Sequence, residues 1–263
     1  MKFLNSLYQK AQVQGVAYTA LDAMKMFAIV NMTADHIGAY FFPHDLWWRA
    51  IGRITFPVWF FLVGYSRSRA LPTSLLVFAA LLVADHPLVG RTIFPMNALV
   101  TVIACRLILN YCTDHKFLPR RLPELIVVFC ALSLVTIPII EYGSVAFMYA
   151  LVGRMVREKE KTHFNALLIS SYVIFIIWQF LGFHFDMFQG AYVVLGTAWV
   201  VWWLSRCPND TIWPDWTKSR FKIFVTVLSR NTLPYYFYHR LLLEVLSALL
   251  LGGGIGFSLK FFG

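Results

Sequence analysis

The stretch that decides the fold is residues 22–69, DAMKMFAIVNMTADHIGAYFFPHDLWWRAIGRITFPVWFFLVGYSRSR. It contains two apolar segments, and each carries residues in its interior that can hold charge. These are Asp35 and His36 in the first segment and Arg53 in the second. A charged group inside a helix in hydrocarbon costs several kcal/mol unless it is paired or hydrated. We therefore expect these three residues to have a structural or chemical role.

The composition of the whole chain excludes an ordinary soluble domain. Hydrophobic residues make up 59% of the 263 residues and charged residues only 14%, and the mean hydropathy is +0.64. These values are typical of a polytopic membrane protein. The connections between the apolar runs are short, so we predict a single all-α transmembrane domain over residues 1–263. The four cysteines show neither metal nor disulfide spacing, and no metal site is expected.

The apolar runs, bounded by charge clusters, glycine and proline, predict about nine transmembrane helices. Their predicted ranges are 22–42, 46–69, 73–89, 93–111, 124–140, 143–157, 163–183, 188–205 and 232–251. We expect residues 1–16 to form a short surface helix, residues 210–218 to lie at the membrane interface, and residues 221–228 to be an amphipathic segment before the last span.

Lysine and arginine are distributed asymmetrically over the alternating connections. Most of the 23 fall on the side of the N-terminus, and the other side carries Arg49, Arg53, Arg91 and Lys260. The positive-inside rule therefore places the N-terminus in the cytoplasm. It also accounts for the net charge of +10 without a nucleic-acid partner.

Helix rise predicts that His36 and Arg53 lie at the same depth. His36 is about six residues before the end of the first span and Arg53 about six after the start of the second, so both lie roughly 10 Å below the extracytoplasmic surface. Asp35 points about 100° away from His36 on the helix, so we expect Asp35 to pair with Arg53 across the hairpin. His36 is then free to act as a base near neutral pH. Alternatively, it is bonded to a neighbouring helix.

Further polar residues are predicted at the same extracytoplasmic half of the membrane, where they would position a substrate. They are Asp85, His86, Asn97, Glu141 and Tyr142. Of these, Asn97 and Tyr142 are candidates for stabilising an oxyanion or holding an amine.

Tyr238 and His239 are predicted to lie roughly 10 Å into the last span from its cytoplasmic end, and therefore opposite His36 in depth. Histidines reached from both faces suggest a path between them for a cytosolic carrier. An equally good interpretation is that His239 and Arg240 snorkel to the cytoplasmic interface.

The cytoplasmic connections carry arginines that could hold the phosphates of such a carrier, although the positive-inside rule alone explains them. They are Arg67, Arg69, Arg154 and Arg157. Pro57 is expected to bend the second span, and Gly52 and Gly64 to permit close helix packing.

Four motifs in the first two predicted helices resemble the TraX family. They are DAMKM (22–26), MTADHIG (32–38), IGRITFP (51–57) and FLVGY (61–65), and single residues in later helices follow in the same order: Asn97, Tyr142 with Gly143, and Tyr238 with His239. The resemblance implies a multi-pass acetyltransferase of the inner membrane that uses acetyl-CoA to acetylate the N-terminal amine of conjugative pilin. It implies Asp35, His36 and Arg53 as the catalytic residues, and membrane lipid and a pilin or other small membrane acceptor as partners. The first helices are also similar to wider groups of transmembrane acyltransferases.

Two other functions remain open on the sequence. A transporter or proton channel would use Asp35, His36, Arg53 and Asp85 as an ion path, but it favours polar groups through the full bilayer depth, and here they cluster in one half. An O-acyltransferase acting on a glycan or cell-wall precursor would need the same residues, because nothing in the sequence separates amine from hydroxyl acceptors.

Overall fold

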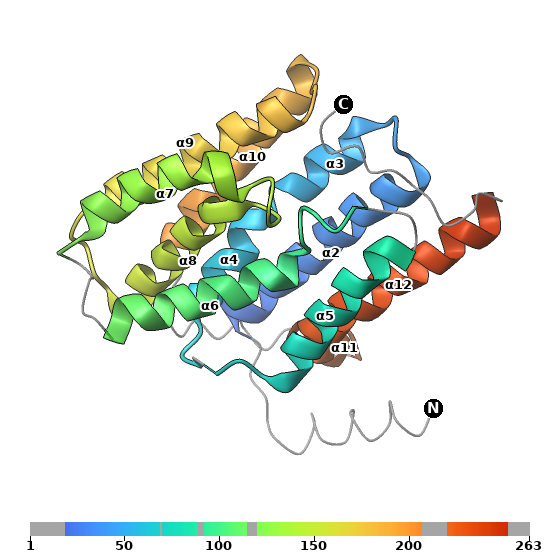
Figure 1. The fold of residues 1–263 in the computed structure, drawn as a ribbon, viewed down its shortest axis with the longest axis horizontal. Helices are drawn as coiled ribbons and strands as arrows, with labels where there is room; N and C mark the ends of the chain where they lie inside the picture. Colours follow the sequence, from blue (N-terminus) through green and yellow to red (C-terminus); the bar gives the residue numbers. More distant parts are fainter. Residues whose placement is uncertain (1–18, 69, 89–91, 115–119, 207–219, 252–263) are drawn as a thin grey trace.

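The computed structural model describes residues 19–68, 70–88, 92–114, 120–206 and 220–251. Within these ranges the chain is mainly helical, and an isolated bridge pairs Met96 with Ile140. The helices in chain order (Figure 1) are α2 (Ala20–Phe41), α3 (Leu46–Arg53), α4 (Phe56–Tyr65), α5 (Thr73–Leu88), α6 (Ala98–Asp114), α7 (Leu122–Thr136), α8 (Gly143–Glu158), α9 (Phe164–Gly182), α10 (Met187–Ser205), α11 (Arg220–Arg230) and α12 (Thr232–Leu251). The expected surface helix at residues 1–16, the interfacial segment at 210–218 and Arg69 lie outside the described residues.

A helix occupies each of the predicted apolar ranges, but the second range is divided. Helix α3 ends at Arg53 and α4 begins at Phe56, with Pro57 at the second position of α4. Proline cannot donate a backbone hydrogen bond and clashes with the preceding turn, so the bend expected at Pro57 is a complete break. The break turns Thr55 and Gly52 toward the interior of the molecule, where both line a cavity.

Helix α8 forms the centre of the fold, and nearly all of its residues are buried. Its packing against α4 depends on two glycines. A Cβ on Gly64 would lie 1.7 Å from the Ala150 carbonyl oxygen, and one on Gly153 would lie 2.0 Å from the Phe61 carbonyl oxygen. The close packing expected at Gly64 is therefore confirmed. Gly52 plays the same part between α3 and α2, because a Cβ there would lie 2.1 Å from the Cβ of Asp35.

The surface and interior have the polarity of a membrane protein. Large apolar side chains are exposed on the outside of α7, α9, α10 and α12; examples are Leu134 (69%), Ile169 (60%), Leu195 (68%) and Leu249 (74%). Charged side chains are instead buried among the helices. In the described part of the chain, α9 and α10 are long and apolar enough to cross a membrane by length and composition.

The last helix, α12, follows α2 in the same direction, and the end of α11 packs at the start of α2. Near the start of α2, Ser229 of α11 donates a hydrogen bond to Asp22 Oδ1 (2.7 Å). Further along, the hydroxyls of Thr33 and Tyr235 lie 2.7 Å apart. Because the end of α11 packs at the start of α2, α12 lies beside the second half of α2 (Figure 1).

Candidate active site

A buried ion cluster joins α2 to α3. Asp35 Oδ2 accepts hydrogen bonds from Arg53 (2.7 Å) and from Arg49 (3.0 Å), and all three residues are less than 10% exposed. The predicted Asp35–Arg53 pair is thus confirmed. The sequence analysis did not predict Arg49 as a partner of Asp35, although it lies within the predicted range 46–69, and α3 begins directly after its N-cap Asp45. Arg49 and Arg53 are therefore one turn apart on one face of α3, and that spacing was the signal for the second arginine.

His36 is hydrogen-bonded to His239 of α12. His36 Nδ1 and His239 Nε2 are 2.7 Å apart, the ring centroids are 4.9 Å apart and the ring planes differ by 11°. The nitrogens are much closer than the centroids, so the rings meet edge to edge. The predicted placement of His239 at the opposite depth is therefore wrong. It assumed that α12 starts at the cytoplasmic surface, whereas α11 displaces that start along α2.

A tight corner between α7 and α8 presents Glu141 and Tyr142 to the same place. The backbone of Glu141 is fixed on both sides, since its N–H donates to the Met96 carbonyl (2.9 Å) and its carbonyl accepts from Thr101 Oγ1 (2.8 Å). Tyr142 has a left-handed backbone with φ 67°, which costs about 1–3 kcal/mol for a side chain of this kind and is concentrated at functional sites.

The Tyr142 ring is held by two neighbours. It stacks on Phe56, with centroids 4.2 Å apart, and the Arg53 guanidinium carbon lies 5.6 Å from its centroid. The strained corner thereby connects the ion cluster of α2 and α3 to the centre of the fold.

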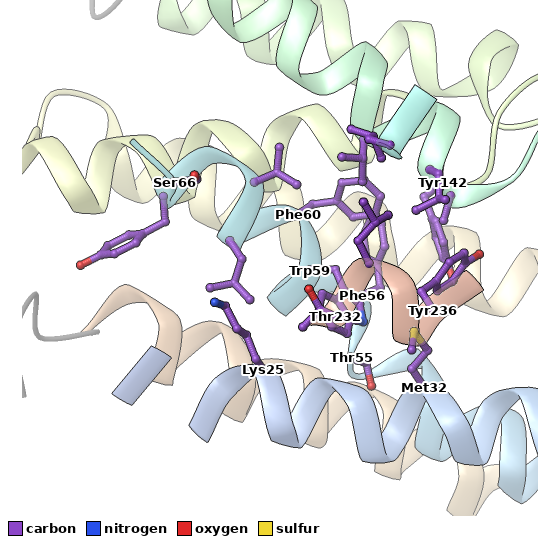
Figure 2. Close-up of a pocket in the computed structure, with 18 of the residues that line it drawn as sticks. Lys25, Met32, Thr55, Phe56, Trp59, Phe60, Ser66, Tyr142, Thr232 and Tyr236 are labelled. Carbon is purple, nitrogen blue, oxygen red and sulfur yellow. The ribbon is translucent and has the colours of Figure 1, made fainter. Parts of the chain in front are cut away.

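A cavity of about 710 Å³ extends from this cluster through the protein. At one end it is lined by Asp35, His36, Glu141, Tyr142 and Tyr236, and at the other by Lys25, Arg67, Arg106 and Arg157. Figure 2 shows Lys25 and Ser66 at one end, Tyr142 and Tyr236 at the other, and Trp59 and Phe60 between them. The cavity thus joins a basic end to the histidine end through an apolar middle. We refer to it as the large cavity.

A second cavity, of about 110 Å³, lies on the other side of the same residues. It shares Asp35, His36, Phe56, Glu141 and Tyr142 with the large cavity, and adds Arg49, Arg53, Gln179 and Arg240. We refer to it as the small cavity. His36 is therefore reached from both cavities.

Three buried polar atoms at the small cavity have no hydrogen-bond partner among the described residues. They are Asp35 Oδ1, Arg53 Nε and Gln179 Oε1. Two of these atoms accept hydrogen bonds and one donates. A buried polar atom without a partner costs free energy, so each is placed to bind a group that enters the cavity.

Several predicted site residues are used elsewhere in the structure. The Asn97 side chain caps α6, accepting from the Leu99 N–H (3.0 Å) and donating to the Ala79 carbonyl (3.1 Å), and Asn97 lines neither cavity. His86 Nε2 accepts a hydrogen bond from Arg240 (2.8 Å) at the end of α5. Neither His86 nor its neighbour Asp85 lines either cavity.

Tyr238, which the sequence predicted beside His239 in the carrier site, lies elsewhere. Tyr238 is 63% exposed and packs against Phe78 outside both cavities, because residues one apart on a helix point about 100° apart. Tyr236 lines the large cavity instead. Its spacing of three residues from His239 puts it on the same helix face, and that spacing was the available signal.

Among the basic residues predicted to hold a carrier, Arg67 and Arg157 line the large cavity. Arg157 also donates a hydrogen bond to the Ser66 carbonyl, which fixes the segment after α4. Arg154 instead pairs with Glu158 one turn on (3.0 Å). Lys25 and Arg106 were not predicted for this role, and only the tertiary structure gathers them at the cavity end.

The described residues contain no group of three or more His, Cys, Asp or Glu side chains that could hold a metal ion. The junction of the two cavities presents an imidazole, two carboxylates, arginines and tyrosine hydroxyls. Such a set can move a proton and stabilise a developing negative charge.

Residues 20–246 match the family described as TraX protein. A segment of 148 residues is 28% identical to the uncharacterized protein RP591 of Rickettsia prowazekii (strain Madrid E), covering 54% of this chain and 57% of that protein. No solved structure matches the chain.

Proposed function

The chain belongs to the TraX family, and on that premise we propose that it is a multi-pass acetyltransferase of the inner membrane. It transfers an acetyl group from cytosolic acetyl-CoA to the amine of a small membrane-held acceptor, such as the N-terminus of a pilin. The observation that carries this proposal is that His36 lies at the junction of two cavities, one of which has a basic far end.

The large cavity suits acetyl-CoA in charge and shape. Its volume of about 710 Å³ is within the usual range for ligand pockets. The phosphates of CoA would bind Lys25, Arg67, Arg106 and Arg157, since arginine matches phosphate geometry well. The long apolar middle would hold the pantetheine arm and deliver the thioester to His36.

The small cavity favours an amine as the acceptor. Its unpartnered acceptor atoms, Asp35 Oδ1 and Gln179 Oε1, can receive N–H bonds, and Glu141 lines the same cavity. A volume of about 110 Å³ suits the end of an extended chain better than a sugar ring. The small volume therefore supports an N-terminal amine rather than a glycan hydroxyl as the acceptor, two alternatives that the sequence left open.

In the proposed reaction His36 Nε2 removes a proton from the acceptor ammonium group. The nitrogen lone pair then attacks the thioester carbonyl carbon, and the oxyanion that forms accepts a hydrogen bond from Arg53 Nε. The oxyanion collapses, the carbon–sulfur bond breaks, and the departing CoA sulfur leaves as thiolate or takes the proton from His36. The second amine proton passes to water as the amide forms. Hydrogen bonds of the kind given by Arg53 contribute about 10²–10³-fold in rate.

The test is transfer of radiolabelled acetyl from acetyl-CoA by the full chain in nanodiscs. The acceptor is an apolar peptide with a free N-terminus, compared with the same peptide blocked at that terminus. We expect label only on the free peptide, and a loss of about 10²–10⁴-fold in rate for His36→Gln. His44→Gln is the matched control, because His44 is exposed in the turn before α3.

Three results would contradict the proposal in different ways. Label on a lipid-linked glycan but on no peptide would favour the O-acyltransferase. Proton flux in liposomes without acetyl-CoA, together with no label on any acceptor, would favour the channel. Full activity of His36→Gln would keep the enzyme but reject His36 as its base.

A further inference from the structure

We propose that His239 is a positioning residue that fixes His36 in the tautomer with an unprotonated Nε2. The proposal rests on the proposed function for its consequence, because only a base needs a free nitrogen. The tautomer itself is independent of the proposed function, because it follows from the hydrogen bonds of the two rings.

The chain of hydrogen bonds starts at a backbone carbonyl. His239 Nδ1 lies 2.8 Å from the carbonyl oxygen of Tyr235. A carbonyl oxygen can only accept, so His239 Nδ1 carries a hydrogen. A neutral imidazole has one N–H, which leaves His239 Nε2 as an acceptor. His36 Nδ1, 2.7 Å away, must then donate, and the remaining nitrogen of His36 has a free lone pair.

The alternative is a protonated His239 that donates to His36 from Nε2. The charged groups around the pair argue against it. Arg240 on α12 and Arg49 and Arg53 on α3 face Asp35 on α2 and Glu141 at the α7–α8 corner, so the cations already exceed the carboxylates. The ring nitrogens of His239 contact His36 and the Tyr235 carbonyl, and neither of these is a carboxylate. A further buried positive charge without a carboxylate partner is costly.

The neighbouring helix faces hold both rings in this orientation. One turn before His239, the Tyr235 hydroxyl bonds to Thr33 Oγ1, which itself donates to the Ile29 carbonyl (2.8 Å). The Tyr236 ring lies edge-on to both histidines, with a centroid distance of 5.9 Å to each. Rotation of either imidazole would break these contacts.

The hydrogen bond to His239 is also retained when His36 is protonated. When Nε2 takes a proton from the acceptor amine, the Nδ1–H of His36 keeps its acceptor on His239. In serine proteases, loss of the group that fixes the tautomer of the catalytic histidine costs about 10⁴-fold in kcat. We expect a smaller but clear effect here, because the partner is neutral.

Two variants separate positioning from packing. His239→Gln keeps an amide oxygen that can accept from His36 Nδ1, whereas His239→Leu keeps the volume without an acceptor. We expect kcat to fall by about 10²-fold or more in His239→Leu and by less than about tenfold in His239→Gln, with KM for acetyl-CoA unchanged in both. Equal activity of His239→Leu and the parent chain would overturn the proposal, as would an equal loss in both variants when both fold.

A second measurement is independent of activity. The chain is labelled with ¹⁵N-histidine and measured in lipid bilayers by solid-state NMR, and the His36 signals are identified by their absence in His36→Gln. We expect a protonated Nδ1 and a bare Nε2 in the parent chain and in His239→Gln, and a mixture of tautomers in His239→Leu. A protonated Nε2 in the parent chain would overturn the proposal. If no acetyl transfer is found with any acceptor, the proposed function fails, and this spectrum still decides the tautomer.

Discussion

Replacing Gly52 by alanine should break the ion cluster of the active site without changing any charge. A Cβ at this position would lie 2.1 Å from Asp35 Cβ and 2.5 Å from Asp35 Oδ1. Carbon atoms pack at about 3.5–4.0 Å, so α2 and α3 must separate locally by about 1.5 Å or more. The bonds from Asp35 Oδ2 to Arg53 (2.7 Å) and Arg49 (3.0 Å) would then stretch beyond about 4 Å, where they no longer act as hydrogen bonds.

The expected cost is large because the cluster is buried. Breaking a buried ion pair destabilises a protein by about 3–5 kcal/mol, and each kcal/mol shifts the midpoint of thermal unfolding by about 2–4 °C in a chain of this size. We therefore expect the unfolding temperature of Gly52→Ala in detergent to fall by about 6 °C or more. Acetyl transfer should fall with it even well below that temperature, because Asp35 and Arg53 leave the small cavity.

The assay is thermal unfolding in detergent, monitored by size-exclusion chromatography, with acetyl transfer measured on the same preparation. Gly182→Ala is the matched control for stability, since a Cβ at Gly182 has no atom within 4 Å; the parent chain is the control for the rate, because Gly182 lines the small cavity. An unfolding temperature of Gly52→Ala equal to that of Gly182→Ala, with a rate equal to that of the parent chain, would refute the close approach of α3 to Asp35, and with it the geometry of the site.

Three further substitutions test where the structure places residues. Asn97→Ala should lower stability by about 1–2 kcal/mol through loss of the α6 cap, with KM for acetyl-CoA unchanged; a raised KM with normal stability would return Asn97 to the substrate site. Tyr238→Ala should leave KM for acetyl-CoA unchanged, because this side chain is 63% exposed, and a severalfold rise in KM would contradict that placement. Ser229→Ala should lower the free energy of unfolding by about 1–3 kcal/mol, since it removes a hydrogen bond to the Asp22 carboxylate; an unchanged unfolding temperature would show that α11 does not depend on this contact.

The sequence was most informative about local pattern. Apolar runs and breaker residues predicted where helices lie, because helix periodicity and chain breaks are local properties. Counting residues from the helix ends placed His36 and Arg53 at one depth, and the ion pair predicted between Asp35 and Arg53 is present. The close packing at Gly52 and Gly64 also followed from residue type alone, whereas the bend predicted at Pro57 is a complete break.

The same reasoning gave wrong predictions for other residues, because tertiary packing sets where their helices begin and end. The depth of His239 depends on where α12 begins beside α2. This start lies beyond the beginning of α2, because the end of α11 packs there against Asp22. Asn97 is polar and near the expected depth, but its amide is committed to the start of α6. Neither fact is encoded in the spacing of nearby residues.

By itself, the sequence determined that this is a helical membrane protein with a buried Asp35–Arg53 pair near His36, because hydrophobic length and the cost of charge in hydrocarbon act on each segment alone. Only the tertiary structure decided that His36 meets His239, that Arg49 completes the ion cluster, and that basic residues from three separate helices gather at one end of a cavity. Those contacts join residues up to 203 positions apart, and their geometry depends on how helices stack against one another rather than on any one helix.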